Sequence, residues 1–399
     1  MRRRPAQVVA LATVASFVFA CGSPATTSRS TVPSAPRSSA SSTPTPTPSS
    51  TPTPSTHPEG WRSLPSPPTS LGLVNVWTGQ VVLASLRGCC QNMDGDVIYA
   101  FRPGARTWRA MPPYPHGPRV GSAFVWTGSE LIQTGGAREM SDPNGPWMTE
   151  PTRDGMALNP ATRQWRPIAD SPRQVPTQIV FWTGDEAIFA DSTRLLRYDP
   201  TSDRWATGAA LPGVVRGQPT IVWTGQELVV WGGSVLVRGK RSDTEMSLRD
   251  GYAYRPGSDR WRPLPAAPIG AWGAAGVWDG GEVLVWGGTA TRDQGAERFT
   301  QDQGAAYDPA TNSWRQLPQA PVADYQGLVL AGAWTGRELV VYTGRGGGAA
   351  YRPRTDEWRR LPPGPTRWLG GMDAIWTERS LVLLPESYGR KVWEYFPGY

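Results

Sequence analysis

The sequence predicts an all-β protein in which seven four-stranded sheets close into a ring, a seven-bladed β-propeller. Three observations predict it. A tryptophan-led turn recurs seven times, and an aromatic or apolar residue precedes a tryptophan at one fixed spacing six times. The two ends of the repeat region also supply complementary parts of one further sheet. A period of this size indicates a repeat architecture, and it has to be identified before any local assignment.

The first repeated element is Trp-Thr-Gly, where glycine provides the tight turn between the first and second strands of a unit. Its tryptophans are Trp77, Trp126, Trp182, Trp223, Trp278 (as Trp-Asp-Gly), Trp334 and Trp376 (as Trp-Thr-Glu), separated by 49, 56, 41, 55, 56 and 42 residues. A short apolar run follows each turn, as in Glu227 to Trp231, and predicts the second strand.

The second repeated element is an aromatic or apolar residue followed by a tryptophan seven positions later. The pairs are Phe101/Trp108, Leu158/Trp165, Tyr198/Trp205, Tyr254/Trp261, Tyr307/Trp314 and Tyr351/Trp358. We expect the third strand to end near the first member and the fourth strand to carry the tryptophan, with Asp/Asn-Pro-x-Thr or Arg-Pro-x as the turn. One such sheet cannot bury both faces, so the units must pack radially.

The ends of the repeat region predict how the ring closes. The segment from Trp393 to Tyr399 is followed by no fourth strand, whereas Gly60 to Pro65 matches fourth strands such as Ser313 to Pro318 with nothing before it. We expect the N-terminal strand to complete the C-terminal sheet. That pairing makes seven blades and removes an open sheet edge.

A double glycine completes the pattern in three units. Gly135-Gly136, Gly232-Gly233 and Gly287-Gly288 lie nine and ten residues after their Trp-Thr-Gly tryptophan. With the spaced tyrosine and tryptophan, this pattern resembles the kelch repeat over roughly residues 60–399, and it implies a propeller like the central domain of galactose oxidase. The other units depart from it, with Thr343-Gly344, Leu86-Arg87, Asp191-Ser192 and Pro385-Glu386 in place of the glycines. The resemblance is specific for the fold and not for a function.

The first twenty residues predict a signal peptide. Met1-Arg2-Arg3-Arg4 is positively charged, and the apolar stretch from Val8 to Ala20 has 13 residues, too short for a membrane span. Val18-Phe19-Ala20-Cys21 resembles the lipobox of bacterial lipoproteins, which implies a lipid on the Cys21 thiol and cleavage before that residue. The alternative is an ordinary signal peptide with a chance cysteine.

Residues 21–58 predict a tether, and residues 59–399 the propeller. Between Ser23 and the propeller nearly every residue is serine, threonine, proline or alanine, a composition that cannot bury a core. We expect an extended stalk, with O-glycosylation left open, that carries a monomer on the outer side of the cytoplasmic membrane or at the cell surface. The lipid would be its only contact with the membrane.

The net charge of +7 does not predict a nucleic-acid partner. Residues 1–58 hold five arginines and no acidic residue, so the repeat region has 35 basic and 33 acidic residues. A net charge of +2 over that region is too small to indicate a nucleic-acid-binding surface.

The loops between the second and third strands predict where function lies. They are long in units one, two, four and five, at 87–96, 137–155, 234–251 and 289–304, and short in the other three. In a propeller these loops lie on the face opposite the short, uniform turns. Variable loops on a rigid scaffold usually carry binding, so we expect the binding site on this face.

The connections between units add candidate ligand-binding residues at the mouth of the central channel. Arg119 and Arg216 precede their Trp-Thr-Gly tryptophans by seven residues, and Arg173 and Arg367 by nine. The neighbouring positions hold Trp272, Asp324, Tyr325 and Trp368. Guanidinium groups bind carboxylates and rings stack on sugars, so the set predicts an anionic or carbohydrate ligand. The alternative is that these arginines pair with aspartates and glutamates of adjacent loops as solvated surface.

The sequence predicts no metal and no cofactor. It has two histidines, and His57 lies in the stalk, so only His116 remains for the propeller. Histidine-rich zinc and copper sites are therefore excluded. The copper site of galactose oxidase needs two histidines and a cysteine crosslinked to tyrosine, which this chain cannot supply. We also find no Gly-x-Ser-x-Gly nucleophile motif.

Cys89 and Cys90 form the remaining unusual feature. Outside the cytoplasm we expect them to oxidise. A bond between these neighbours would staple the loop of unit one, or would give a strained, reducible disulfide with a redox or ligand-binding role. Two free thiols and intermolecular bonds are the other possibilities.

These observations favour a binding module over a catalyst, because no assembled acid, base, nucleophile or metal set is visible. The expected partner is an acidic sugar or an envelope protein. The alternative is a carbohydrate-active enzyme resembling the sialic-acid mutarotases, which would use Arg119, Arg216, Arg367 and Asp324. A third possibility is a purely structural envelope protein.

Overall fold

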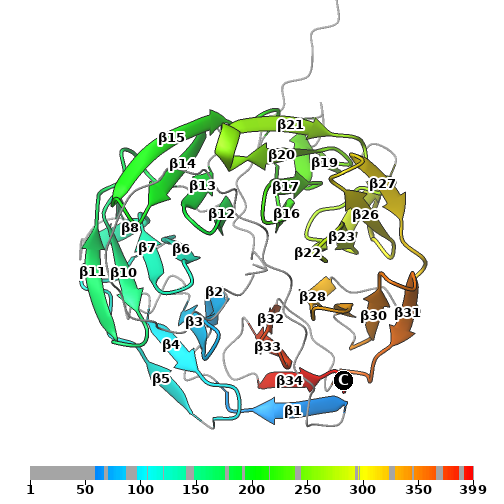
Figure 1. Ribbon diagram of the computed structural model, residues 1–399, viewed down its shortest axis with the longest axis horizontal. Helices are drawn as coiled ribbons and strands as arrows, with labels where there is room; N and C mark the ends of the chain where they lie inside the picture. The colour runs from blue at the N-terminus through cyan, green and yellow to red at the C-terminus, as the bar shows by residue number, and fades with distance from the viewer. Residues whose placement is uncertain are drawn as a thin grey trace, which may run out of the picture.

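The computed structural model describes residues 59–398, apart from 67–70, 87–96, 106, 120, 141–147, 176–178, 191–193, 215, 239–243, 293–294, 296, 323–328, 344–345, 365–371 and 386–390. Seven four-stranded antiparallel sheets surround a central axis (Figure 1). The predicted fold class and number of blades are therefore confirmed. Among the residues described, no helix is long and apolar enough to cross a membrane.

Each blade has the predicted order of strands, from the axis outward. Blades one to three are β2 (Leu71–Trp77), β3 (Val82–Leu86), β4 (Ile98–Phe101) and β5 (Trp108–Ala110); β6 (Ala123–Trp126), β7 (Leu131–Thr134), β10 (Gly155–Asn159) and β11 (Gln164–Ile168); and β12 (Ile179–Trp182), β13 (Ala187–Ala190), β14 (Arg194–Asp199) and β15 (Arg204–Ala210). Each Trp-Thr-Gly tryptophan is the last residue of the innermost strand.

The remaining blades repeat this arrangement. They are β16 (Thr220–Trp223), β17 (Leu228–Trp231), β20 (Gly251–Arg255) and β21 (Arg260–Leu264); β22 (Ala275–Trp278), β23 (Val283–Trp286), β26 (Gly304–Asp308) and β27 (Ser313–Gln316); β28 (Val329–Trp334), β29 (Leu339–Thr343), β30 (Gly348–Arg352) and β31 (Glu357–Arg360); and β32 (Met372–Trp376), β33 (Leu381–Pro385), β34 (Val392–Phe396) and β1 (Gly60–Leu64). A 3₁₀ turn, η1 (Pro256–Ser258), joins β20 to β21.

The spaced aromatic pairs are cross-strand neighbours on the two outer strands. Tyr254 lies directly opposite Trp261, with ring centroids 5.0 Å apart. The ends of the chain make the seventh pair, because β1 lies antiparallel to β34 and places Trp61 opposite Tyr395 at 5.2 Å. The predicted closure of the ring by the N-terminal strand is confirmed.

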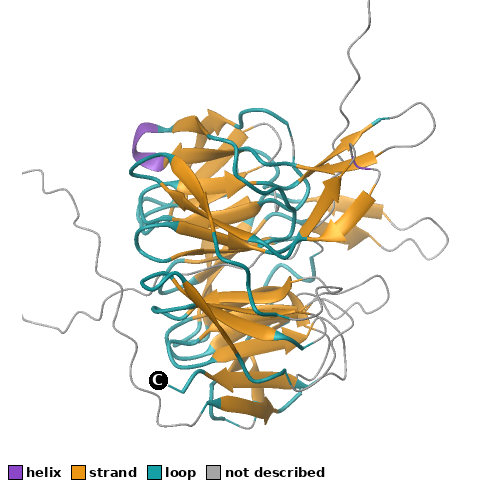
Figure 2. Cartoon of the chain, turned by 90° about the vertical axis from the view of Figure 1, so that its right-hand side faces the viewer, coloured by secondary structure: helices purple, strands orange, loops and turns teal. Residues whose placement is uncertain are grey.

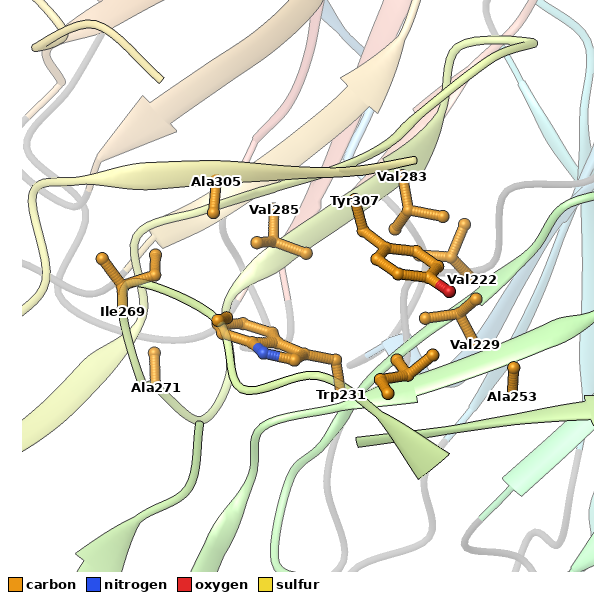
Figure 3. Packing of buried hydrophobic residues seen from close by; sticks show 12 residues of the cluster. Val222, Val229, Trp231, Ala253, Ile269, Ala271, Val283, Val285, Ala305 and Tyr307 are labelled. Carbon is orange, nitrogen blue, oxygen red and sulfur yellow. The ribbon is translucent and has the colours of Figure 1, made fainter. Parts of the chain in front are cut away.

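The hydrophobic core lies between neighbouring blades. In the cluster between blades four and five, Val229 and Trp231 of β17 face Val283 of β23 and Tyr307 of β26 (Figure 3). All four side chains are fully buried. Burial of one such side chain contributes about 1.5–3 kcal/mol, and the repeat supplies a similar cluster at each junction.

A glutamate–arginine ion pair fixes the outer strands of six blades. The pairs are Glu130–Arg166, Glu186–Arg197, Glu227–Arg262, Glu282–Arg315, Glu338–Arg359 and Glu394–Arg62. In the first five pairs the glutamate stands four residues after the Trp-Thr-Gly tryptophan. Blade seven has Ser380 there, and Glu394 of β34 replaces the missing carboxylate and accepts a hydrogen bond from that serine.

The structure contains three extra two-stranded hairpins, and extra strands project from one face of the ring (Figure 2). They are β8 (Ala137–Met140) with β9 (Met148–Pro151), β18 (Ser234–Val237) with β19 (Thr244–Ser247), and β24 (Thr289–Arg292) with β25 (Glu297–Thr300). They form the long connections of blades two, four and five. The sequence predicted loops there, because these four-residue strands are short and share no common pattern of apolar residues. The blade-one loop lies outside the described residues.

Candidate functional site

An arginine–aspartate pair fixes the base of the hairpin in blades two and four. Arg119 donates to both carboxylate oxygens of Asp154, at 2.7 and 2.5 Å. Arg216 binds Asp250 in the same way, at 2.9 and 2.7 Å. Both pairs are two-pronged, the strongest arrangement of a guanidinium and a carboxylate. We call each pair a clamp.

Each clamp also holds the double glycine. Arg119 donates to the carbonyl of Gly135 at 3.3 Å, and Arg216 donates to that of Gly232 at 3.0 Å. Gly232 has a φ of +66°, and a Cβ atom there would lie 2.5 Å from the carbonyl oxygen of Ala271. The glycine therefore lets the connection between blades four and five approach the hairpin base closely.

Two of the predicted ligand-binding residues, Arg119 and Arg216, are engaged in these clamps. The Arg119 side chain is fully buried and that of Arg216 nearly so. A tyrosine ring also lies against each guanidinium, Tyr114 at 5.3 Å and Tyr252 at 5.1 Å. The sequence offered the alternative that these arginines pair with aspartates and glutamates of adjacent loops, and their partners are indeed aspartates. The two arginines are nevertheless buried rather than solvated.

Sequence reasoning missed the two aspartates, although the sequence carries a signal for them. Arg-Asp-Gly occurs directly before the third strand of blades two and four, at 153–155 and 249–251. The arginine of the tripeptide binds the following connection, since Arg153 donates to Pro172 and Arg249 donates to Ala267 and Pro268. The aspartate completes the clamp and the glycine begins the strand.

Two further basic side chains gather at the clamp of blade two. Nδ1 of His116 hydrogen-bonds to Asp154, and a guanidinium nitrogen of Arg138 on β8 lies 3.9 Å from the same carboxylate. Their side chains are 37% and 50% exposed, so both reach the surface. The equivalent positions of blade four hold Gly213 and Val235. Among the described residues, three basic groups therefore lie beside Asp154 and one lies beside Asp250.

The two clamp aspartates are held in their ionised form. Burial raises the pKa of Asp154, but hydrogen bonds from Arg119 and His116 outweigh that effect and hold the pKa well below its usual range. Hydrogen bonding from Arg216 likewise lowers the pKa of Asp250. Neither carboxylate suits a general acid. Within the described part of the chain, no group of three or more His, Cys, Asp or Glu side chains could hold a metal ion.

Of the other predicted site residues, the structure describes Trp272 and Arg173. Trp272 precedes blade five, where it is buried and exchanges backbone hydrogen bonds with Thr289 at 2.9 Å. Arg173 is partly buried in the connection between blades two and three. The predicted residues Cys21, Cys89, Cys90, Asp324, Tyr325, Arg367 and Trp368 lie outside the described residues.

The hairpins of blades four and five support each other. Ser247 of β19 and Thr291 of β24 exchange backbone-to-hydroxyl hydrogen bonds at 3.0 and 3.1 Å. Glu245 of β19 pairs with Arg298 of β25 at 2.8 Å, and the Arg298 guanidinium lies 5.8 Å from the Trp272 ring centre. These contacts join the two hairpins to each other on this face.

Comparison with known proteins gives partial relatives and a shared fold. No family model matches the chain. Two curated relatives, the N-acetylneuraminate epimerases of Haemophilus influenzae strains 86-028NP and PittEE, are each 27% identical over 175 residues. Each match covers 37% of this chain and 45% of the relative, so the chain spans about half the length of the curated relatives it matches.

Solved structures show the same architecture. The structure of YjhT superposes with a TM-score of 0.50 at 14% identity, covering 75% of this chain and 99% of that one. YCF48 bound to D1 peptide superposes with a TM-score of 0.54 at 13% identity, covering 85% of this chain and 95% of that one. Identities this low support the fold alone. With the glycine pairs, the spaced aromatic pairs and the seven closed sheets, they identify the protein as a kelch-like β-propeller.

Proposed function

We propose that this protein is a tethered, extracytoplasmic propeller that binds an acidic sugar on its hairpin-bearing face. The difference between the two faces carries the proposal. One face repeats the same short turns in every described unit, whereas the other bears three hairpins of unrelated sequence (Figure 2). Clamps and cross-hairpin bonds hold those hairpins rigidly, and variable loops on a rigid scaffold are the usual basis of a binding site.

Two observations support an acidic sugar as the ligand. The partial relatives are N-acetylneuraminate epimerases, and N-acetylneuraminate is a sugar with a carboxylate. The hairpin-bearing face also presents exposed basic side chains, including His116, Arg138 and Arg298. Guanidinium groups recognise carboxylates by paired hydrogen bonds. Binding is favoured over catalysis because both clamp carboxylates are paired and ionised.

The position of the first described strand sets the orientation of the proposed tether. In every blade the fourth strand begins at the turn-bearing face, and β1 is the fourth strand of blade seven. Glu59 is held at that end by Arg359 at 2.8 Å and by the Tyr395 hydroxyl. A stalk lipidated at Cys21 would therefore leave from the turn-bearing face. The hairpin-bearing face would then point away from the membrane.

Calorimetric titration of the full chain tests the proposed function. We expect N-acetylneuraminate to bind and a neutral N-acetylated sugar not to bind, with an affinity that falls as salt rises because the attraction is between charges. Equal affinity for both sugars would show that the carboxylate of the ligand is not recognised. If neither sugar binds, the proposal of a sugar ligand is rejected. An envelope protein is then the partner to test.

An enzyme acting on an acidic sugar is the second candidate. The name of the partial relatives favours it, and so does the pair of His116 with Asp154. A carboxylate that holds Nδ1 leaves Nε2 as a proton acceptor, the usual arrangement for a histidine base. Proton NMR of freshly dissolved N-acetylneuraminate measures the rate at which its anomers interconvert. If the protein is an enzyme, it should raise that rate, and His116→Gln should abolish the increase. A rate equal to that in buffer alone would reject catalysis of this interconversion.

A further inference from the structure

The clamp of blade two carries basic groups that its counterpart in blade four lacks. We propose that Arg138 and His116 form a two-armed receptor for the carboxylate of an acidic ligand, positioned by the Arg119–Asp154 clamp beneath them. The proposal rests on the proposed function and assigns it to one site. It predicts that blade two binds the anion and blade four does not.

Asp154 and Arg119 neutralise each other, so the charges of Arg138 and of protonated His116 are not balanced by the clamp. Both oxygens of Asp154 accept hydrogen bonds from Arg119, whose side chain is fully buried. Arg138 stands 3.9 Å from Asp154, which is too far for a hydrogen bond. No described residue accepts a hydrogen bond from Arg138, and half of its side chain is exposed.

His116 supplies the second arm in its protonated form. Asp154, from the segment before β10, fixes Nδ1, and the Tyr114 ring lies edge-on to the imidazole at 5.7 Å. The other charged groups around it are Arg119 behind Asp154 and Arg138 on β8. With Nδ1 engaged, Nε2 is the nitrogen left for a ligand.

A carboxylate has two oxygens and fits two donors on separate side chains. One oxygen would accept from the Arg138 guanidinium and the other from Nε2 of the His116 imidazolium, both charge-assisted hydrogen bonds. Inorganic phosphate offers the same kind of acceptor oxygens. A phosphate titration therefore separates recognition of the anion from recognition of the sugar.

The test measures the Kd of N-acetylneuraminate and of inorganic phosphate for the full chain. Arg138→Ala should weaken the binding of both probes at least about tenfold, because it removes a charge-assisted donor. His116→Gln, which removes the second charged donor, should also weaken the binding of both probes. Arg109→Ala, which removes an exposed arginine from β5 of blade one, should change nothing.

Two of the three outcomes separate the site from the proposed function. Sugar binding that is unchanged in Arg138→Ala and His116→Gln overturns the site and leaves the proposed function standing. Phosphate binding that depends on Arg138, without sugar binding, supports an anion site and rejects the sugar. If neither probe binds, both proposals fall.

Discussion

Asp154 and Asp250 occupy equivalent positions in their blades, yet their surroundings differ. The Asp154 side chain is 20% exposed and that of Asp250 is 50% exposed. Removing the arginine should therefore affect the two clamps unequally. We expect Arg119→Ala to lower the free energy of unfolding by about 3 kcal/mol, because it leaves a largely buried carboxylate with one partner fewer.

The matched change in blade four is the control for that prediction. Arg216→Ala leaves an aspartate that water can reach, so we expect a loss of about 1–2 kcal/mol. Urea unfolding of both variants at pH 7 measures the two losses. Equal losses would contradict a difference in burial between the clamps.

The lowered pKa of Asp154 predicts a specific dependence of stability on pH. In the unfolded chain an aspartate has a pKa of about 3.9. The pKa of Asp154 in the folded chain is lower, so the unfolded chain binds more protons in acid. The stabilisation is complete above about pH 5 and is lost as the pH falls toward the folded-state pKa. We expect the stability difference between the native chain and Asp154→Asn to shrink between pH 7 and pH 3 in urea unfolding. A constant difference would mean that Asp154 is not held ionised.

At the scale of the element, the glutamate–arginine pair is present in six blades, but the arginine does not always come from the same strand. In blade four Arg262 projects from the fourth strand opposite Ala253 of the third. Blade three reverses this order, with Arg197 on β14 opposite Ala206 on β15, and still pairs with Glu186 at 2.6 Å. The contact between the charges is therefore common to the blades, and the strand that supplies the arginine is not.

This interchange predicts a rescue. Arg197→Ala should destabilise the protein by about 1.5 kcal/mol, since it removes a charged hydrogen bond. The double variant Arg197→Ala/Ala206→Arg should recover most of that loss, because it recreates the arrangement of blades two, four, five and six. Urea unfolding compares the two variants. A double variant no more stable than the single one would show that β15, with its register shift, cannot present the arginine to Glu186.

At the scale of the whole molecule, the sequence predicts the ring and its closure because the signals for them are local and repeated. The opposition of Trp61 and Tyr395 confirms a strand pairing expected from unmatched ends. The candidate site was harder to predict because its contacts join distant segments. Arg119 meets Asp154 only when a connection packs against the base of a hairpin. The Arg-Asp-Gly tripeptide signals this contact, whereas no motif pairs His116 with Asp154.

Hydrogen–deuterium exchange of the full chain with and without N-acetylneuraminate tests the central claim most directly. The hairpin-bearing face is claimed as the binding surface, so bound ligand should slow amide exchange in the connection before blade two and along β8 and β9. The turns that carry Trp-Thr-Gly should exchange at unchanged rates. Protection confined to the turn-bearing face, or no protection at saturating ligand, would contradict the account.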